Sequence, residues 1–362
     1  MPVCPIVGHC QPDSDSVFQE ELIDMLSRIF IVGTGRSGTW ILYRTLGAHK
    51  DIHAFPAELR FLIDSGGLLD LIDSLTTSYS PLRARQALVN FEQLMRIHLA
   101  TPGAGPYAAL NLPGWLGEDF YWQALDRFCE QLIEVEYEGW AWDIEKQDEG
   151  RLVAGAKGLQ RLRRSIQGSN KLPAVPTDKT LKEARYFSNR KQLISLAACF
   201  VDELFFHAAR ANGKRAWCEK TPQHLLHLDF IQELFPESFF IHMKRDPRGV
   251  IYSLAKQRWA PHDLEGACHY MLGTYKRWLD LKMTMPLATS NYMEIKLEEL
   301  AQTPLPFLEQ IMSSCSLAND FANLPELDVD KVNYWKRQMS RQEINLVNNI
   351  LGPHIEQMGY PI

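Results

Sequence analysis

The chain has 362 residues, of which 46% are hydrophobic, and a formal net charge of −6. This length and apolar content are enough to bury a large core, in one elaborated domain or in a domain with a cap, and they exclude a disordered chain. The negative balance argues against a general nucleic-acid binder, because the average field would repel a phosphate backbone. Local basic turns can still hold a single nucleotide.

Residues 1–27 have acidic residues and prolines but not the apolar core of a signal peptide, so we expect a leader that is flexible or contacts a partner. A short amphipathic helix is predicted within it, around residues 18–26. Cys4, His9 and Cys10 lack an evident fourth donor, so no metal site is expected there. No stretch approaches the roughly eighteen apolar residues of a membrane span.

The cysteines are scattered and odd in number, without a Cys-x-x-Cys pair, at positions 4, 10, 129, 199, 218, 268 and 315. Free thiols in a reducing compartment explain this pattern best. We therefore expect a cytoplasmic protein.

The first predicted strand leads into a glycine-rich turn, and residues 29–40 read IFIVGTGRSGTW. Gly33 and Gly38 copy the spacing of the nucleoside-triphosphate loop, but Thr39 stands where that loop has its lysine. Backbone N–H groups at such a helix start hold a phosphate whatever the side chains. Without the lysine and a magnesium carboxylate, a triphosphate has poor charge compensation at its γ end. The turn therefore predicts an anion holder, with Arg36 as its nearest positive charge.

After a second short strand near residues 52–55, apolar residues recur at helical spacing. Helices are expected over residues 68–75, 88–99, 121–135 and 185–212, with a Pro/Gly-rich break at 101–117. Residues 150–182 are polar and basic and include Arg161, Arg163 and Arg164, for which a solvated loop is favoured over a contact with an acidic acceptor. We expect one domain over residues 28–362, with a helical insert at about 60–215.

The second half alternates strands with helices. Strands are predicted at residues 216–218, 239–243 and 292–296, and helices at 224–235 and 264–283. This order predicts an α/β fold with a parallel sheet covered on both faces, and ligands at the carboxyl ends of the strands.

A basic turn follows the strand at residues 239–243. Arg245 lies at the end of that strand, and Ser253 stands eight residues later, two turns into the next helix. A guanidinium and a hydroxyl could converge there on one further phosphate.

The glycine-rich turn and this segment together resemble the two nucleotide signatures of the sulfotransferases that use 3′-phosphoadenosine 5′-phosphosulfate (PAPS), a family with a P-loop-like fold. The resemblance implies that the Arg-Ser-Gly-Thr turn grips the 5′-phosphosulfate, and that Arg245 and Ser253 grip the 3′-phosphate. It covers roughly residues 28–65 and 215–340.

Further matches point to the tyrosylprotein-type and related bacterial branch. Glu58-Leu-Arg60 resembles its Glu-x-Arg, which implies Glu58 as the general base, and Lys220-Thr-Pro222 resembles its Lys-x-Pro, whose lysine contacts the phosphosulfate. Leu297 replaces the tyrosine of a Tyr-Glu-x-Leu turn. Residues 334–336 resemble a late lysine segment, which makes Lys336 a candidate cofactor ligand.

The implied reaction is in-line transfer of a SO₃ unit to a hydroxyl through a loose transition state, by analogy with phosphoryl transfer. We expect Lys220 and Arg36 to neutralise charge on the 5′-phosphate oxygen, and Glu58 to accept the hydroxyl proton. His53 and His224 stay open as rival bases. The expected donors to the 5′-phosphate are Ser37, Gly38, Thr39 and Trp40.

Two other functions stay open: a P-loop kinase-like phosphotransferase, and a noncatalytic nucleotide-binding protein with the same fold. The acceptor is equally open between a lipid, a polyketide, a glycan and a peptide hydroxyl, and so is the oligomeric state. Aromatic residues of the insert could line an apolar acceptor cleft, although core packing explains most of them equally well. They include Trp115, Tyr121, Trp122, Tyr137, Trp140 and Trp142.

Overall fold

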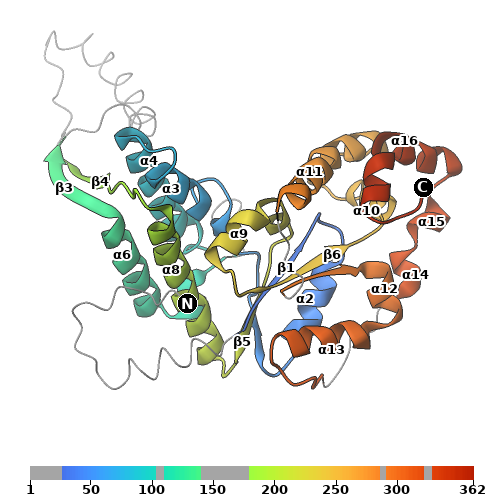
Figure 1. Ribbon diagram of the computed structural model, residues 1–362, viewed down its shortest axis with the longest axis horizontal. Coiled ribbons are helices and arrows are strands. Elements are labelled where there is room, and N and C mark those ends of the chain that lie inside the picture. The colour runs from blue at the N-terminus through green and yellow to red at the C-terminus, as the bar shows by residue number, and fades with distance from the viewer. Residues whose placement is uncertain (1–26, 103–109, 140–178, 286–290, 322–327) are drawn as a thin grey trace, which may run out of the picture.

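The computed structural model describes residues 27–102, 110–139, 179–285, 291–321 and 328–362 (Figure 1). The predicted helix at residues 18–26, the Cys4, His9 and Cys10 group, and most of the basic segment at 150–182 lie outside these ranges. Trp140 and Trp142 lie outside them as well.

The centre of the fold is a five-stranded parallel sheet with the order β2-β5-β1-β6-β7. Its strands are β1 (Ser27–Gly33), β2 (Ile52–Ala54), β5 (Ala216–Lys220), β6 (Phe239–Lys244) and β7 (Tyr292–Lys296). The apolar run of β1 is buried on both faces, as is typical of an internal parallel strand. The predicted parallel α/β sheet is therefore confirmed.

Alternate residues of β1 belong to two separate cores because successive side chains of a strand point to opposite faces. Ile29 and Ile31 pack with α2 (Thr39–Gly47), α12 (Leu297–Gln302), α13 (Pro304–Ser314) and α14 (Val329–Val332). Phe30 and Val32 pack on the other face. The helices of that face include α9 (Leu228–Leu234), α10 (Pro247–Leu254), α11 (Leu264–Thr284), α15 (Trp335–Gln338) and α16 (Arg341–Gln357).

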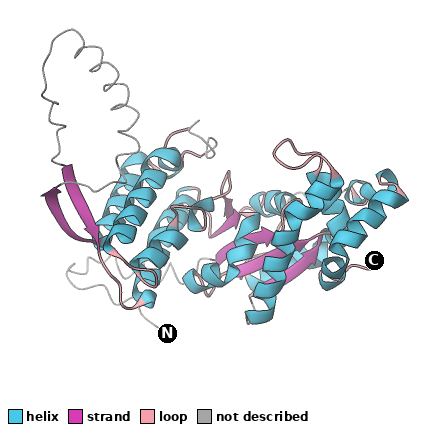
Figure 2. Cartoon of the chain, turned by 90° about the horizontal axis from the view of Figure 1, so that it is seen from above, coloured by secondary structure: helices cyan, strands magenta, loops and turns pink. Residues whose placement is uncertain are grey.

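The helices between β2 and β5 form a bundle at one end of the sheet (Figures 1 and 2). They are α3 (Leu68–Leu75), α4 (Pro81–Gln93) with a π-helical turn at Leu94–His98, α5 (Leu112–Leu116), α6 (Glu118–Leu132) and α8 (Arg190–Ala211). Two 3₁₀ turns, Arg60–Leu62 and Pro222–His227, begin and follow this stretch of chain.

An antiparallel ribbon of β3 (Ile133–Gly139) and β4 (Lys179–Ala184) projects from the bundle (Figure 2). The sequence prediction of a helix through residue 135 is wrong here, because α6 ends at Leu132. The reason is visible in IEVEYEG, which alternates apolar and acidic residues with the period of a strand rather than a helix.

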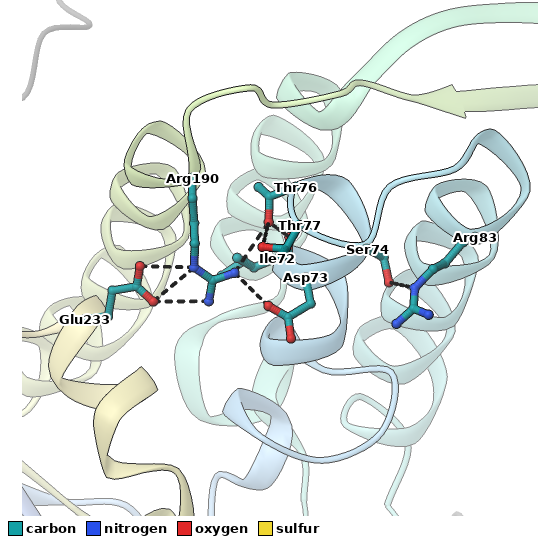
Figure 3. Close-up of polar contacts among 8 residues, drawn as sticks. All are labelled: Ile72, Asp73, Ser74, Thr76, Thr77, Arg83, Arg190 and Glu233. Atoms are coloured by element: carbon teal, nitrogen blue, oxygen red, sulfur yellow. Dashed lines mark hydrogen bonds and ion pairs between the residues drawn. The ribbon is translucent and has the colours of Figure 1, made fainter. Parts of the chain in front are cut away.

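Arg190, at the start of α8, joins three helices (Figure 3). Its Nη1 lies 2.6 Å from Asp73 Oδ1 on α3, and its Nε lies 3.1 Å from Glu233 Oε1 on α9. This contact ties the bundle to a helix that covers the sheet.

Helix α8 corrects one sequence expectation, since its length and composition would let it cross a membrane. More than half of this stretch is buried inside the molecule, which is the environment of a core helix. Apolar residues face several sides of α8 because it packs against α6, α9 and the sheet.

Candidate functional site

The turn between β1 and α2 has a backbone that only a few residue types adopt. Gly35, Arg36 and Gly38 have φ values of +82°, +54° and +90°. A Cβ on Gly38 would lie 2.6 Å from Leu297 Cδ1, so this glycine is needed both for its φ and for the close approach of α12. The turn places Ser37 in the core and leaves Arg36 at the surface.

Within this turn the predicted phosphate ligands differ in their surroundings. Ser37 is fully buried, and its Oγ has no hydrogen-bond partner in the described structure. Thr39 is also buried, whereas Trp40 is 54% exposed and stacks on the Arg44 guanidinium. Burying a hydroxyl without a partner is unfavourable, and an anion that accepts a hydrogen bond from it would remove this cost.

Arg36, Arg245 and Ser253 come together at the carboxyl ends of β1 and β6. Arg36 Nε donates to Ser253 Oγ at 3.0 Å, and Arg245 Nη1 donates to the Arg36 carbonyl oxygen at 3.1 Å. Arg245 also donates to the Val332 carbonyl oxygen at 3.0 Å, while its buried Nε has no hydrogen-bond partner among the described residues. Burial lowers the pKa of Arg245, yet a guanidinium keeps its charge in proteins.

The sequence predicted an Arg245 and Ser253 pair, and the structure adds Arg36 as the side chain that contacts the serine. No salt bridge joins Arg245 to Asp246 among the described residues. Asp246 instead caps α10 and pairs with Arg248 at 2.7 Å.

A second group lies at the ends of β5 and β2. Lys220 Nζ donates to Glu58 Oε1 at 2.6 Å, with 11% and 32% of the two side chains exposed. Lys220 Nζ also lies 6.0 Å from the centre of the Tyr43 ring. The hydroxyl of Tyr43 donates to the Phe55 carbonyl oxygen, and burial raises the pKa of Tyr43 to about 12. Tyr43 is therefore a neutral donor that holds the end of β2 beside Lys220.

The two histidines named as rival bases have different surroundings. His224 is fully buried, and its Nδ1 lies 3.1 Å from Glu219 Oε2, which favours a structural role. His53 is partly buried on β2 against the Phe55 ring, and burial lowers its pKa.

Lys336 is exposed on α15, with its Nζ 5.7 Å from the Trp335 ring. Trp335 packs against α10, because a Cβ on Gly249 would meet Trp335 Cδ1 at 2.8 Å and Arg245 Nε at 3.0 Å. No hydrogen bond between described residues joins Lys336 to Arg36, Arg245 or Ser253. Its role as a cofactor ligand stays a prediction.

The aromatic residues of the insert are mostly packed. Tyr121 is fully buried and donates to the Met95 carbonyl oxygen at 2.8 Å. Trp115 and Trp122 are partly buried against the core, and Tyr137 is 40% exposed on the ribbon. Core packing therefore accounts for three of the four described members of this set.

Sequence reasoning missed Glu219, Tyr43 and the last residues of the chain as neighbours of the site. Tyr360 donates to Glu298 Oε2 at 3.0 Å, and Glu298 Oε1 accepts from the Asp246 N–H at 3.0 Å. A signal existed for Glu219 alone, since a charged residue inside the buried strand AWCEK needs a partner.

Comparison with known proteins places the chain in a family. The model of the sulfotransferase family matches residues 128–321, which is more than half of the chain. The chain belongs to the sulfotransferase family. The matched range contains Lys220, Arg245 and Ser253, whereas Arg36 and Glu58 precede it.

Individual relatives of this sulfotransferase are distant. Over 73 residues it is 34% identical to the nodulation protein NoeE of Sinorhizobium fredii, a match over 20% of this chain and 17% of that protein. The sulfotransferase domain of the Synechococcus PCC 7002 olefin synthase is 16% identical with a TM-score of 0.46, over 93% of this chain and 96% of that one. Sulfotransferase STF9 from Mycobacterium avium is 12% identical with a TM-score of 0.39, over 96% of this chain and 82% of that one.

Proposed function

We propose that this sulfotransferase moves a sulfuryl group from PAPS to the hydroxyl of an acceptor by in-line displacement. The observation that carries the choice of donor is the cluster of Arg36, Arg245 and Ser253 beside the phosphate-type turn. The turn alone could bind many phosphate-bearing ligands. The additional group of guanidinium and hydroxyl side chains fits a sulfuryl donor that carries a separate 3′-phosphate.

The residues present fit such a donor. Ser37 Oγ and Arg245 Nε are buried polar atoms without a hydrogen-bond partner among the described residues, and each is a donor that an anion would satisfy. The N–H groups at the start of α2 and its dipole favour the same charge. When bound, PAPS supplies an activated sulfuryl group on its 5′-phosphate.

The ion pair of Lys220 and Glu58 supports the assignment of catalytic roles. Lys220 donates a hydrogen bond to the oxygen that becomes negative as the bond to sulfur breaks. Arg36, expected from the sequence to share this role, donates instead to Ser253 in the group proposed for the 3′-phosphate. Glu58 accepts the proton of the attacking hydroxyl, a step that typically contributes about 10²–10⁴-fold. Lys220 Nζ and Glu58 Oε1 lie 2.6 Å apart, so the two proposed catalytic side chains belong to one site.

The acceptor is a hydroxyl compound, and we propose a small molecule such as a polyketide, a lipid or a glycan. We place the reaction in the cytoplasm. Incubation with ³⁵S-labelled PAPS and a panel of these hydroxyl compounds tests the reaction. If no acceptor becomes labelled and no labelled sulfate is released by transfer to water, the proposal is contradicted.

The donor is tested by calorimetry with the product nucleotide, 3′-phosphoadenosine 5′-phosphate (PAP). We expect PAP to bind about tenfold to over a hundredfold more tightly than AMP, because one charge-assisted pair is worth roughly 1.5–3 kcal/mol. Arg245→Ala should reduce this preference, whereas Lys50→Ala, at an exposed ion pair with Asp320, should not. Equal affinities for PAP and AMP contradict the second phosphate site.

A further inference from the structure

Glu219 is a fully buried carboxylate next to Lys220 in β5. Its Oε1 accepts a hydrogen bond from the backbone N–H of Leu59 at 3.0 Å, and another from the Thr221 hydroxyl. Its Oε2 faces His224 Nδ1 at 3.1 Å. The residue that donates its N–H, Leu59, directly follows Glu58.

Burying a carboxylate is unfavourable in free energy unless hydrogen bonds or opposite charges compensate for its loss of solvation. Burial by itself raises the pKa of Glu219, but the neighbouring His224 and the hydrogen bonds from Thr221 and Leu59 outweigh it and lower the pKa. Glu219 is therefore ionised at neutral pH. An ionised carboxylate accepts a stronger hydrogen bond from a backbone N–H than a neutral group does.

Leu59, Phe61 and Leu62 of the segment that carries Glu58 are fully buried in the core, but few of the described hydrogen bonds join this segment to the sheet. The Phe55 N–H donates to the Cys218 carbonyl oxygen at 3.3 Å, where the pairing of β2 with β5 ends. Beyond that point, the described hydrogen bonds to β5 are those from Leu59 to Glu219 and from Lys220 to Glu58. Glu219 and Lys220 are successive strand residues whose side chains point to opposite faces. Residues 58 and 59 therefore straddle the end of β5.

We infer that Glu219 is a positioning residue that holds Leu59, and through it holds the Glu58 carboxylate against Lys220 in the reactive geometry. This inference rests on the proposed function for the role of Glu58. Positioning matters because a displacement of about 1 Å of a catalytic group can cost about 10²-fold in rate.

The test compares Glu219→Ala and Glu219→Gln with wild type in steady-state kinetics and PAP calorimetry, per folded molecule. Glu219→Ala should lower kcat by about 10- to 100-fold, with the Kd for PAP and the KM for PAPS nearly unchanged. Glu219→Gln should recover part of this loss, because its amide oxygen still accepts from the Leu59 N–H. Wild-type kcat in Glu219→Ala, or no recovery in Glu219→Gln, overturns the inference.

The matched control is Asp202→Asn. Asp202 is a partly buried carboxylate on α8, paired at 2.8 Å with Arg28, near the amino end of β1. Its loss should lower stability without changing kcat per folded molecule. In the Glu58→Gln background, Glu219→Ala should add little further loss, because it acts through the base; a full further loss overturns the inference.

Hydrogen exchange separates this inference from the proposed reaction. The peptide that contains residues 56–62 should exchange at least about tenfold faster in Glu219→Ala, because one main-chain hydrogen bond of that segment is gone. Asp202→Asn should leave it unchanged. Unchanged exchange in Glu219→Ala overturns the positioning role. Faster exchange in a protein that transfers no sulfate upholds the positioning and contradicts only the proposed function.

Discussion

At the scale of single residues, substitution of Lys220 distinguishes an effect on the rate of sulfuryl transfer from an effect on nucleotide binding. Its ammonium should matter most in the transition state, because charge on the bridging oxygen grows only as the bond to sulfur breaks. We therefore expect Lys220→Ala to lower kcat by about 10²–10³-fold while the Kd for PAP changes much less. Kinetics at saturating PAPS, paired with calorimetry, measure both effects. Intact turnover in this variant would contradict the catalytic role of Lys220 and leave it only a structural ion pair with Glu58.

Glu58 tests the assignment of the base. Glu58→Gln keeps the size of the side chain and an oxygen that accepts from Lys220, but it cannot take a proton. Turnover should fall by about 10²-fold or more, with PAP affinity near wild type. The comparison variant is His53→Ala, on the neighbouring strand end. If Glu58→Gln kept its turnover and His53→Ala lost it, the base would be His53.

Sequence reasoning selected Arg36, Lys220, Arg245 and Ser253 because each lies at or shortly after the end of a recognisable buried strand. It could not find that Arg36 contacts Ser253, because that contact depends on the positive φ values at Gly35 and Arg36. It could not find the bond from Leu59 to Glu219, because these residues are far apart in the chain and meet only by tertiary packing.

At the scale of elements, Gly33 shows how closely β1, β6 and the turn fit together. A Cβ on Gly33 would lie 2.5 Å from Ser37 Oγ and 2.8 Å from the Met243 carbonyl oxygen, which belongs to the backbone of β6. Gly33→Ala should therefore lower the free energy of unfolding by about 1–3 kcal/mol and weaken PAP binding, because the turn must shift. Urea denaturation and calorimetry measure the two effects.

Gly273→Ala is the matched control for this prediction. Gly273 lies inside α11, and nothing lies within 4 Å of the position that its Cβ would take. Alanine there should raise stability by up to about 1 kcal/mol, because it favours the helix. Equal effects of the two substitutions would mean that the close contacts of Gly33 carry no cost.

Helices and strands with one clear hydrophobic pattern could be predicted from the sequence, whereas the antiparallel ribbon of β3 and β4 could not. The buried apolar runs of β1, β5 and β6 and the helical spacing of α11 leave a single interpretation. Strands β3 and β4 are separated by 39 residues of sequence, from 140 to 178, so no short hairpin signal marks their pairing. The period-two pattern of β3 was present but followed a helical pattern without a break.

At the scale of the whole molecule, the last residues of the chain return to the turn that carries Arg245, in the proposed nucleotide half of the site. Arg248, which pairs with Asp246, donates to the Pro361 carbonyl oxygen at 2.8 Å. Burial and the neighbouring Glu298 raise the pKa of Tyr360, so its hydroxyl is a donor at neutral pH. Through Glu298 and Asp246, residues 360 and 361 brace the turn that carries Arg245.

Tyr360→Phe removes the hydroxyl from this chain of contacts and leaves Glu298 with one partner fewer. We expect the free energy of unfolding to fall by about 1 kcal/mol, and the Kd for PAP to rise by about three- to tenfold because the turn bearing Arg245 is held less firmly. At saturating PAPS, kcat should stay near wild type, since Lys220 and Glu58 lie at other strand ends. Tyr270→Phe, at an exposed position of α11, is the control. A Kd for PAP that is the same in Tyr360→Phe, Tyr270→Phe and wild type would limit the end of the chain to general stability, whereas a loss confined to Tyr360→Phe would make it part of the nucleotide site.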